Sequence, residues 1–195
     1  FNQLADKYKL GKIKEEEVEH LRTLSVMEKC KFMGVPLYLI PVLTMEVMKN
    51  YHKCIGSLRT FKGINDVIFQ LKEQDLRLSI ISSNSKKNVE QFLKNNDIDV
   101  FDNIYCLSSL FGKDKAIGSF IKRYNLKKEE LVYVGDEHRD VISCKANCVK
   151  VIAVLWGYDS LELLTKAGPD FMVKNPSEII SLVVPGVPAT GYLSY

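Results

Sequence analysis

Three closely spaced acidic residues follow a short apolar segment in the second half of the chain. The segment LVYVGDEHRD (131–140) begins with four apolar residues, reaches Gly135, and then carries Asp136, Glu137 and Asp140. The apolar residues predict a strand, and the carboxyl ends of strands are where open α/β sheets bind ligands. Paired carboxylates offer the hard oxygen ligands that Mg²⁺ prefers. The alternative is that Asp136 caps the next helix while Asp140 is a solvated surface acid.

A second polar motif, SSNS (82–85), follows an earlier apolar segment that also predicts a strand. Ser82, Ser83 and Asn84 offer hydroxyl groups, an amide and backbone donors, which suit a phosphate group at the N-terminus of a helix. Ordinary capping of the following helix, with Ser85 as the N-cap, is the alternative. The motif alone therefore favours capping over phosphate binding.

A third motif, FGKDK (111–115), supplies a positive charge. Lys113 or Lys115 can neutralise anionic oxygens, although a lone lysine is usually exposed to solvent. Hydroxyl groups, a lysine and paired acids at three strand ends form a combination that is much rarer than its parts. Anion donors, a cation and metal ligands predict a phosphoryl-transfer site.

These motifs need a parallel sheet that brings strand ends to one edge. From about residue 60 onward, apolar segments of strand length alternate with segments of helical periodicity, which predicts a Rossmann-like, doubly wound parallel α/β sheet. A helix is also expected after position 160, with Asp159 and Glu162 as its caps, and Asn175 and Glu178 have the spacing of a capping box. The strands are expected at 76–81, 104–107, 131–134, 149–155 and 171–173.

The first part of the chain lacks any strand signal. Residues 1–60 have helical spacing of apolar residues, as at Val18, Leu21 and Leu24, and are expected to form a small helical domain. Its methionines and aromatic residues are expected mainly to pack in its core, with a substrate pocket as the alternative. Residues 61–184 are expected to form the α/β core domain, and 185–195 a loose C-terminal tail.

Composition excludes several classes of protein. The 27 basic and 24 acidic residues give a formal net charge of +3, which is too balanced to indicate a nucleic-acid partner. No apolar run approaches the roughly 18 residues of a membrane span, and no signal peptide is visible. Five cysteines at irregular spacings indicate reduced thiols and a cytoplasmic location. Nothing in the sequence indicates an oligomeric state.

The ordered set of motifs resembles a known family. LSIISSNS, FGKDK and LVYVGDEHRD, with the downstream segments VKVIAVLWGYDS and AGPDFMVKNPSEII, are similar to the haloacid dehalogenase-like hydrolase superfamily, within it to the phosphoglycolate phosphatase-like branch. The resemblance extends from Phe1 to about Leu182. It implies that residues up to about 60 are the small helical cap, which closes over the substrate and tunes specificity.

The resemblance also implies roles for the motif residues. Ser82 would be the hydroxyl that binds the transferring phosphoryl group, and Lys113 the lysine that offsets its charge, with Lys115 as the alternative. Asp136 and Asp140 would hold Mg²⁺, with Glu137 as a further helper. The activity implied is a phosphatase that acts on a small phosphorylated metabolite through an aspartyl-phosphate intermediate.

One motif of the family is absent from the 195 residues. The family's nucleophile is an aspartate in a DxDGT-like motif at the end of the first strand, and Asp6, on an expected helix without a neighbouring glycine, does not replace it. The resemblance implies that this strand lies between the strands that end at Ser82 and Gly135. We expect it to precede Phe1, because a protein without it would expose two long apolar edges.

Two other functions stay open at the sequence level. A phosphomutase would use the same residues and return the phosphoryl group to a sugar. A non-catalytic binding or regulatory module would keep the fold without the nucleophile. A dehalogenase is disfavoured, because that chemistry needs no metal and the segment GDEHRD offers a full acidic set.

Overall fold

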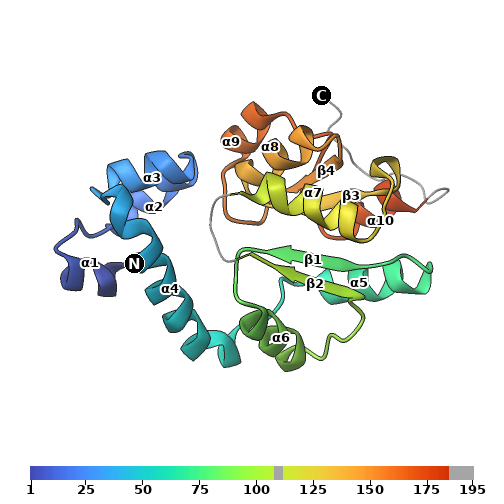
Figure 1. The fold of residues 1–195 in the computed structure, drawn as a ribbon, viewed down its shortest axis with the longest axis horizontal. Coiled ribbons are helices and arrows are strands. Elements are labelled where there is room, and N and C mark those ends of the chain that lie inside the picture. Colours follow the sequence, from blue (N-terminus) through green and yellow to red (C-terminus); the bar gives the residue numbers. More distant parts are fainter. Residues whose placement is uncertain (108–111, 185–195) are drawn as a thin grey trace.

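The computed structural model describes residues 1–107 and 112–184, and the expected tail at 185–195 lies outside these ranges. A group of helices lies beside an α/β part that contains all the described strands (Figure 1). The change from helices alone to alternating strands and helices falls between Ser57 and Ile64. The domain boundary at residue 60 itself stays a prediction.

The helical module comprises residues 1–57. Its own small core is formed by Leu4, Val35, Ile40 and Leu43. The start of α3 is fixed by a capping box, in which the N–H of Ser25 donates to the Glu28 carboxylate at 2.8 Å. Its helices are α1 (Asn2–Tyr8), α2 (Val18–Arg22), α3 (Val26–Phe32) and α4 (Ile40–Cys54), with 3₁₀ turns at Glu15–Glu17, Leu37–Leu39 and Ile55–Ser57.

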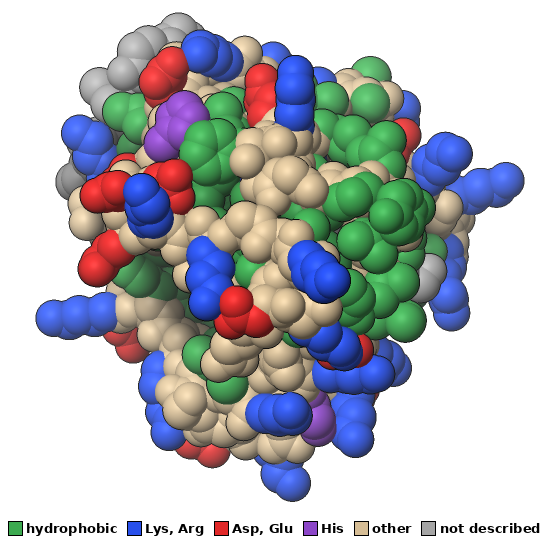
Figure 2. Space-filling model, turned by 90° about the vertical axis from the view of Figure 1, so that its left-hand side faces the viewer, with side chains coloured by type: hydrophobic (Ala, Val, Ile, Leu, Met, Phe, Trp, Pro, Cys, Tyr) green, Lys and Arg blue, Asp and Glu red, His purple; other side chains and the backbone are tan. Residues whose placement is uncertain are grey.

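Many large apolar side chains of this module face outward, contrary to the expectation that they pack inside it. Met27, Tyr38 and Met45 are exposed, Tyr38 to 77%. Figure 2, which looks onto this side of the molecule, shows hydrophobic side chains gathered on the surface between scattered lysines and arginines. The module is too small to bury them, because short helices around a single small core leave most side chains on the outside.

The α/β part follows the expected order of elements. The strand predicted at 76–81 begins only at Ser79 in the structure and ends at Ser82. The other four strands agree with their predicted positions within about two residues. The elements are α5 (Ile64–Glu73), β1 (Ser79–Ser82), α6 (Lys86–Asn95), β2 (Asn103–Cys106), α7 (Lys113–Arg123), a 3₁₀ turn (Lys128–Glu130), β3 (Val132–Gly135), α8 (His138–Ala146), β4 (Lys150–Val154), α9 (Leu161–Ala167), β5 (Phe171–Val173) and α10 (Glu178–Val183).

Strand β4 shows that helices cover both faces of the sheet. Val151 and Ala153 pack in a cluster with residues of α7, α8 and α9. Ile152 and Val154 point to the opposite face and pack with residues of α5 and α10. All described strand pairs are parallel. Because side chains alternate along a strand, helices on both faces bury it completely, and the doubly wound parallel arrangement is confirmed.

The described strands form two separate ladders rather than one sheet. One ladder has the order β1-β2 and the other β3-β4-β5, so within the described residues no strand pairs with the free edge of β1 or of β3. Val132 and Val134 on β3 are 40% and 42% exposed, which is unusual for apolar residues of a parallel sheet covered by helices on both faces. The Tyr133 hydroxyl donates across the gap to the carbonyl of Ile81 at 3.5 Å.

Two helix caps differ from the sequence-based expectation. The N-cap of α9 is Ser160, whose hydroxyl accepts from the N–H of Leu163, so the assignment of Asp159 and Glu162 as caps was wrong. At α10, the Glu178 carboxylate accepts from the N–H of Asn175 at 3.0 Å, which is one half of the predicted capping box.

Among the described residues, no single helix has the length and apolar composition to cross a bilayer; only the pair Val26–Phe32 and Leu37–Ser57, bent by 113°, passes that test when taken together.

Candidate active site

Asp136 follows β3 directly and is held by the loop that follows β4. The N–H of Tyr158 donates to its carboxylate at 2.8 Å, and the N–H of Asp159 donates to its carbonyl at 3.1 Å. A Cβ atom at Gly157 would overlap the Asp136 side chain, so only glycine permits this close approach. The N-cap position of α8 is occupied by Glu137, so Asp136 is not the cap of that helix.

Asp140 and Lys113 form a buried ion pair. Asp140 lies in the first turn of α8 and is 2% exposed, and Lys113 is the first residue of α7 and is 8% exposed. Burial raises the pKa of Asp140, and the ammonium group of Lys113 acts in the opposite direction. Asp140 is therefore no solvated surface acid. Lys115 is exposed, so Lys113 is the lysine of this motif that reaches the acidic residues.

Gly135 has a spatial role in the same motif. A Cβ atom at this position would lie against both the Asp140 carboxylate and the ring of Tyr133. The Lys113 ammonium lies 5.5 Å from the centre of that ring. Burial raises the pKa of the Tyr133 hydroxyl well above its ordinary value, so this group stays neutral. The glycine between strand and acids therefore lets the ion pair pack against the end of β3.

Glu137 is engaged by Arg139 rather than by the other acids. The Arg139 guanidinium donates to both carboxylate oxygens of Glu137, with one distance of 2.8 Å. The same guanidinium donates to the hydroxyl of Ser83 at 3.2 Å. Because Ser83 follows β1 and Arg139 belongs to α8, this side chain connects the two ladders at their carboxyl ends.

The SSNS motif forms a tight loop at the end of β1. The Ser82 hydroxyl accepts from the N–H of Asn84 at 3.0 Å, and the Asn84 side chain accepts from the N–H of Ser85 at 2.8 Å. Ser85 is the N-cap of α6, as expected. Asn84 also accepts from the amide of the buried Asn88 at 3.0 Å. The structure thus bears out the capping alternative for Ser85, and Ser83 contacts Arg139 across the gap between the ladders.

The acidic residues form a pair of candidate metal ligands, not a cluster of three. Within residues 1–107 and 112–184, no group of three or more His, Cys, Asp or Glu side chains is arranged to hold a metal ion. Asp136 and Asp140 are near enough for the charge of one to raise the pKa of the other. Mg²⁺ commonly uses one or two carboxylates together with waters and substrate phosphate, so these two residues fit that ion.

A surface hollow elsewhere on the molecule does not coincide with these residues. It has a volume of about 470 Å³ and lies beside the end of α6 and the segment before β2. Its lining includes Glu90, Lys94, Asp97 and Phe101, and none of the predicted site residues. The cluster of Lys113, Asp136 and Asp140 indicates the site better than this open hollow does.

Several residues of the site were missed by sequence reasoning. Arg139 lies inside the acidic motif but was not assigned a role, although an arginine between two acids is a visible sign of ion pairing. Asp159 was taken for a helix cap. Lys29, from the helical module, forms an ion pair with Asp159 at 2.8 Å. A contact over 130 positions leaves no local pattern in a single sequence.

Comparison with known proteins identifies the family. The model of the family described as haloacid dehalogenase-like hydrolase matches residues 1–154. The chain is 28% identical over 172 residues to a phosphoglycolate phosphatase of Synechococcus elongatus. This alignment covers 88% of this chain and 81% of that protein. It is 24% identical over 192 residues to the pyrophosphatase PpaX of Bacillus pumilus, with coverages of 94% and 86%.

A solved structure agrees in fold. A haloacid dehalogenase-like family hydrolase from Streptococcus pneumoniae superposes with a TM-score of 0.73 at 18% identity, and the match covers 91% of this chain and 85% of that one. The family match spans more than half of the chain and includes Ser82, Lys113, Asp136 and Asp140. The chain therefore belongs to the haloacid dehalogenase-like hydrolase family.

Proposed function

We propose that the protein is a Mg²⁺-dependent phosphatase that acts on a small phosphorylated metabolite in the cytoplasm. The observation that carries this proposal is the buried pair of Lys113 and Asp140 beside Asp136, at the carboxyl end of β3. A cation and two carboxylates at this edge match the charge pattern of a phosphoryl group and its metal. The named activities of the relatives, a phosphoglycolate phosphatase and a pyrophosphatase, support the same class of reaction.

Each side chain has a role in this proposal. Ser82, with Ser83 and Asn84, binds the phosphoryl oxygens through hydroxyl, amide and backbone donors. Lys113 offsets the negative charge of those oxygens. Because the ammonium group already touches Asp140, it is held in place before the substrate arrives, which avoids a cost of reorganisation.

Asp136 and Asp140 would hold Mg²⁺, and Glu137 would assist from a distance through Arg139. When bound, the ion would act as a Lewis acid on a phosphoryl oxygen. Asp136 is kept in place by the N–H of Tyr158, which fixes one of its two carboxylate oxygens and leaves the other for a ligand.

We further propose that the nucleophilic aspartate lies on a strand between β1 and β3 and forms the aspartyl-phosphate intermediate, which water then hydrolyses. The edges of β1 and β3 that no described strand pairs with, and the exposed Val132 and Val134, support a strand at this place. A strand between them would satisfy the backbone groups of both edges and cover the two valines.

The test compares the protein that begins at Phe1 with a version extended upstream through an apolar strand and a DxDGT-like motif. The protein that begins at Phe1 should hydrolyse para-nitrophenyl phosphate no faster than buffer, because the remaining groups only stabilise charge around a nucleophile. The extended version should hydrolyse it with Mg²⁺, and changing its first aspartate to asparagine should abolish the activity.

Turnover by the protein that begins at Phe1 would show that another residue is the nucleophile. Phosphoglycolate and pyrophosphate serve as further substrates in the same assay. Transfer of the phosphoryl group to a sugar instead of water would identify a phosphomutase. Inactivity of the extended version towards all these substrates would favour a non-catalytic module with the same fold.

A further inference from the structure

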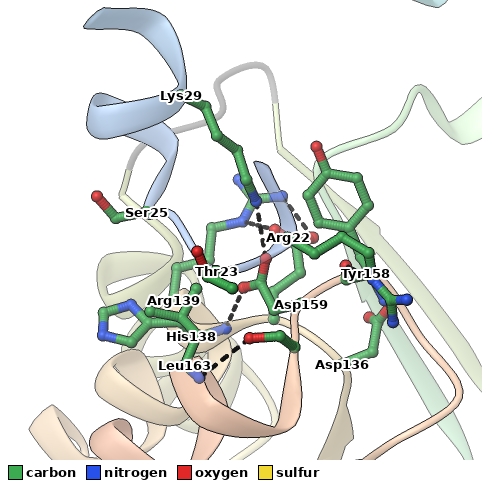
Figure 3. A network of polar contacts seen from close by, with 12 residues as sticks. Arg22, Thr23, Ser25, Lys29, Asp136, His138, Arg139, Tyr158, Asp159 and Leu163 are labelled. Atoms are coloured by element: carbon green, nitrogen blue, oxygen red, sulfur yellow. Dashed lines mark hydrogen bonds and ion pairs between the residues drawn. The ribbon is translucent and has the colours of Figure 1, made fainter. Parts of the chain in front are cut away.

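The helical module is joined to the α/β part by a buried ion pair. The ammonium group of Lys29, on α3, lies 2.8 Å from Oδ1 of Asp159, in the loop between β4 and α9. Both residues are buried, at 6% and 4% exposure. The Lys29 ammonium also lies 4.1 Å from the centre of the Tyr158 ring. Figure 3 shows the lysine reaching down from its helix to the loop.

Arg22, at the end of α2, binds the backbone of the same loop. Its guanidinium donates to the carbonyls of Gly157 and Tyr158, each at 3.1 Å. The carbonyl of Arg22 accepts from the N–H of Ser160 at 2.9 Å. The segment 157–160 is therefore bound to the helical module along its whole length, by main-chain as well as side-chain contacts.

The other side of this loop holds the segment that contains Asp136. The second carboxylate oxygen of Asp159 accepts from the N–H of His138 at 2.7 Å, so it satisfies a backbone donor at the start of α8 that Glu137 leaves without a side-chain cap. The N–H groups of Tyr158 and Asp159 donate to the carboxylate and the carbonyl of Asp136.

We propose that Lys29 is a positioning residue for Asp136: the ion pair with Asp159 keeps the loop 157–160 in the one arrangement in which the N–H of Tyr158 holds the Asp136 carboxylate. The helical module then sets the geometry of the metal site only while it is docked. The part of this proposal that concerns metal affinity rests on the function proposed above, whereas the part that concerns the loop does not.

The physical reason lies in the burial of Asp159. Without Lys29, its carboxylate would be a buried charge without an opposite charge beside it, which is strongly unfavourable. The loop must then move to bring water to this carboxylate. That movement draws the Tyr158 N–H away from Asp136, because Tyr158 and Asp159 are adjacent in the chain.

The experiment uses the full 195-residue chain with four variants. Lys29→Met removes the charge and keeps the length of the side chain, and Lys29→Arg restores the charge. Asp159→Asn removes the opposite charge. Lys31→Met is the matched control, since Lys31 lies on the same helix and is exposed. Circular dichroism identifies any variant that fails to fold. If Lys29→Met fails to fold, Lys29→Arg is compared with the unchanged protein instead.

The first measurement is hydrogen exchange of the backbone N–H groups of Tyr158, Asp159 and His138. In Lys29→Met these should exchange roughly tenfold faster than in the unchanged protein, because local opening becomes easier. Lys29→Arg should restore most of the protection, and Lys31→Met should leave it unchanged. Unchanged exchange of the Tyr158 N–H in Lys29→Met would overturn the proposal.

The second measurement is the affinity for Mn²⁺, used as a spectroscopic substitute for Mg²⁺. Loss of groups that orient a ligand typically weakens metal binding about 10- to 100-fold, and we expect this for Lys29→Met but not for Lys31→Met. Equal Mn²⁺ affinity in both would also overturn the proposal. If the unchanged protein binds no Mn²⁺, the metal site proposed above is wrong, and hydrogen exchange alone decides the role of Lys29.

Discussion

The ammonium group of Lys113 and the carboxylate of Asp140 form an ion pair that is almost fully buried and joins the start of α7 to the first turn of α8. Two predicted site residues from motifs more than 20 positions apart thus lie in direct contact. The pair neutralises a charge that burial alone would disfavour, and it places the lysine at the carboxyl end of β3.

Removal of this lysine should destabilise the fold strongly. Lys113→Met leaves the buried Asp140 without its partner, a change that typically costs about 3–5 kcal/mol. Lys115→Met, two positions along the same helix, changes an exposed residue and should alter the free energy of unfolding by no more than about 0.5 kcal/mol. Urea unfolding followed by circular dichroism measures both. Equal stability of the two variants would show that the ion pair contributes little.

Gly157 should be intolerant of any side chain. Gly157→Ala places a Cβ atom into the side chain of Asp136, so the loop or the carboxylate must move, at a cost of about 1–3 kcal/mol. Mn²⁺ affinity should fall as well. Gly56→Ala is the control, because a Cβ atom there meets nothing within 4 Å. A Gly157→Ala protein with unchanged stability and Mn²⁺ affinity would contradict the observed packing.

Cys144 should be the least reactive of the five free thiols. Burial raises its pKa from 9.0 to about 12, so at pH 8 it stays protonated, whereas Cys54 and Cys148 are exposed. Iodoacetamide followed by mass spectrometry should label the two exposed thiols first and Cys144 only on unfolding. Since the folded pKa is the higher one, the stability contributed by this thiol is complete below pH 9 and is lost as the pH rises towards 12. Rapid labelling of Cys144 at pH 8 would contradict its burial.

Inorganic phosphate or tungstate should bind at the carboxyl end of β1. Ser82→Ala removes a hydroxyl at this place and should weaken phosphate binding roughly 10- to 100-fold, since a hydrogen bond to a charged group contributes about 1.5–3 kcal/mol. Ser79→Ala, at the amino end of the same strand, is the control. Isothermal titration calorimetry measures the affinity. If tungstate in a crystal binds away from Ser82 and Lys113, the assignment of the anion site is wrong.

The sequence predicted the order of elements well because each strand and helix has its own local pattern. The limits of β1 were less predictable. Leu76 and Leu78 look like strand residues, and they do pack in the core beside β4, but the ladder begins only at Ser79. The backbone N–H of Leu78 instead donates to the Asp102 carboxylate at 2.7 Å. An apolar run predicts that residues are buried, but it does not predict which of them pair with a neighbouring strand.

The three motifs of the site were visible in the sequence because each one follows a strand end. The loop after β4 was not. Asp159 and Ser160 are both common N-cap residues, and the sequence gives no reason to choose between them. The choice falls on Ser160 because Lys29 and the N–H of His138 engage the Asp159 carboxylate. A long-range partner decides the role of a residue that local rules leave ambiguous.

The ion pair between Lys29 and Asp159 has a consequence for exchanging parts between relatives. A helical module transplanted from another family member would bring its own residue to position 29, and a loop that carries Asp159 would accept it only with a cation at that place. The reverse exchange, with a different residue at 159, would leave Lys29 buried without an anion. Helical module and loop therefore depend on each other, and relatives that have both should show coupled substitutions at positions 29 and 159.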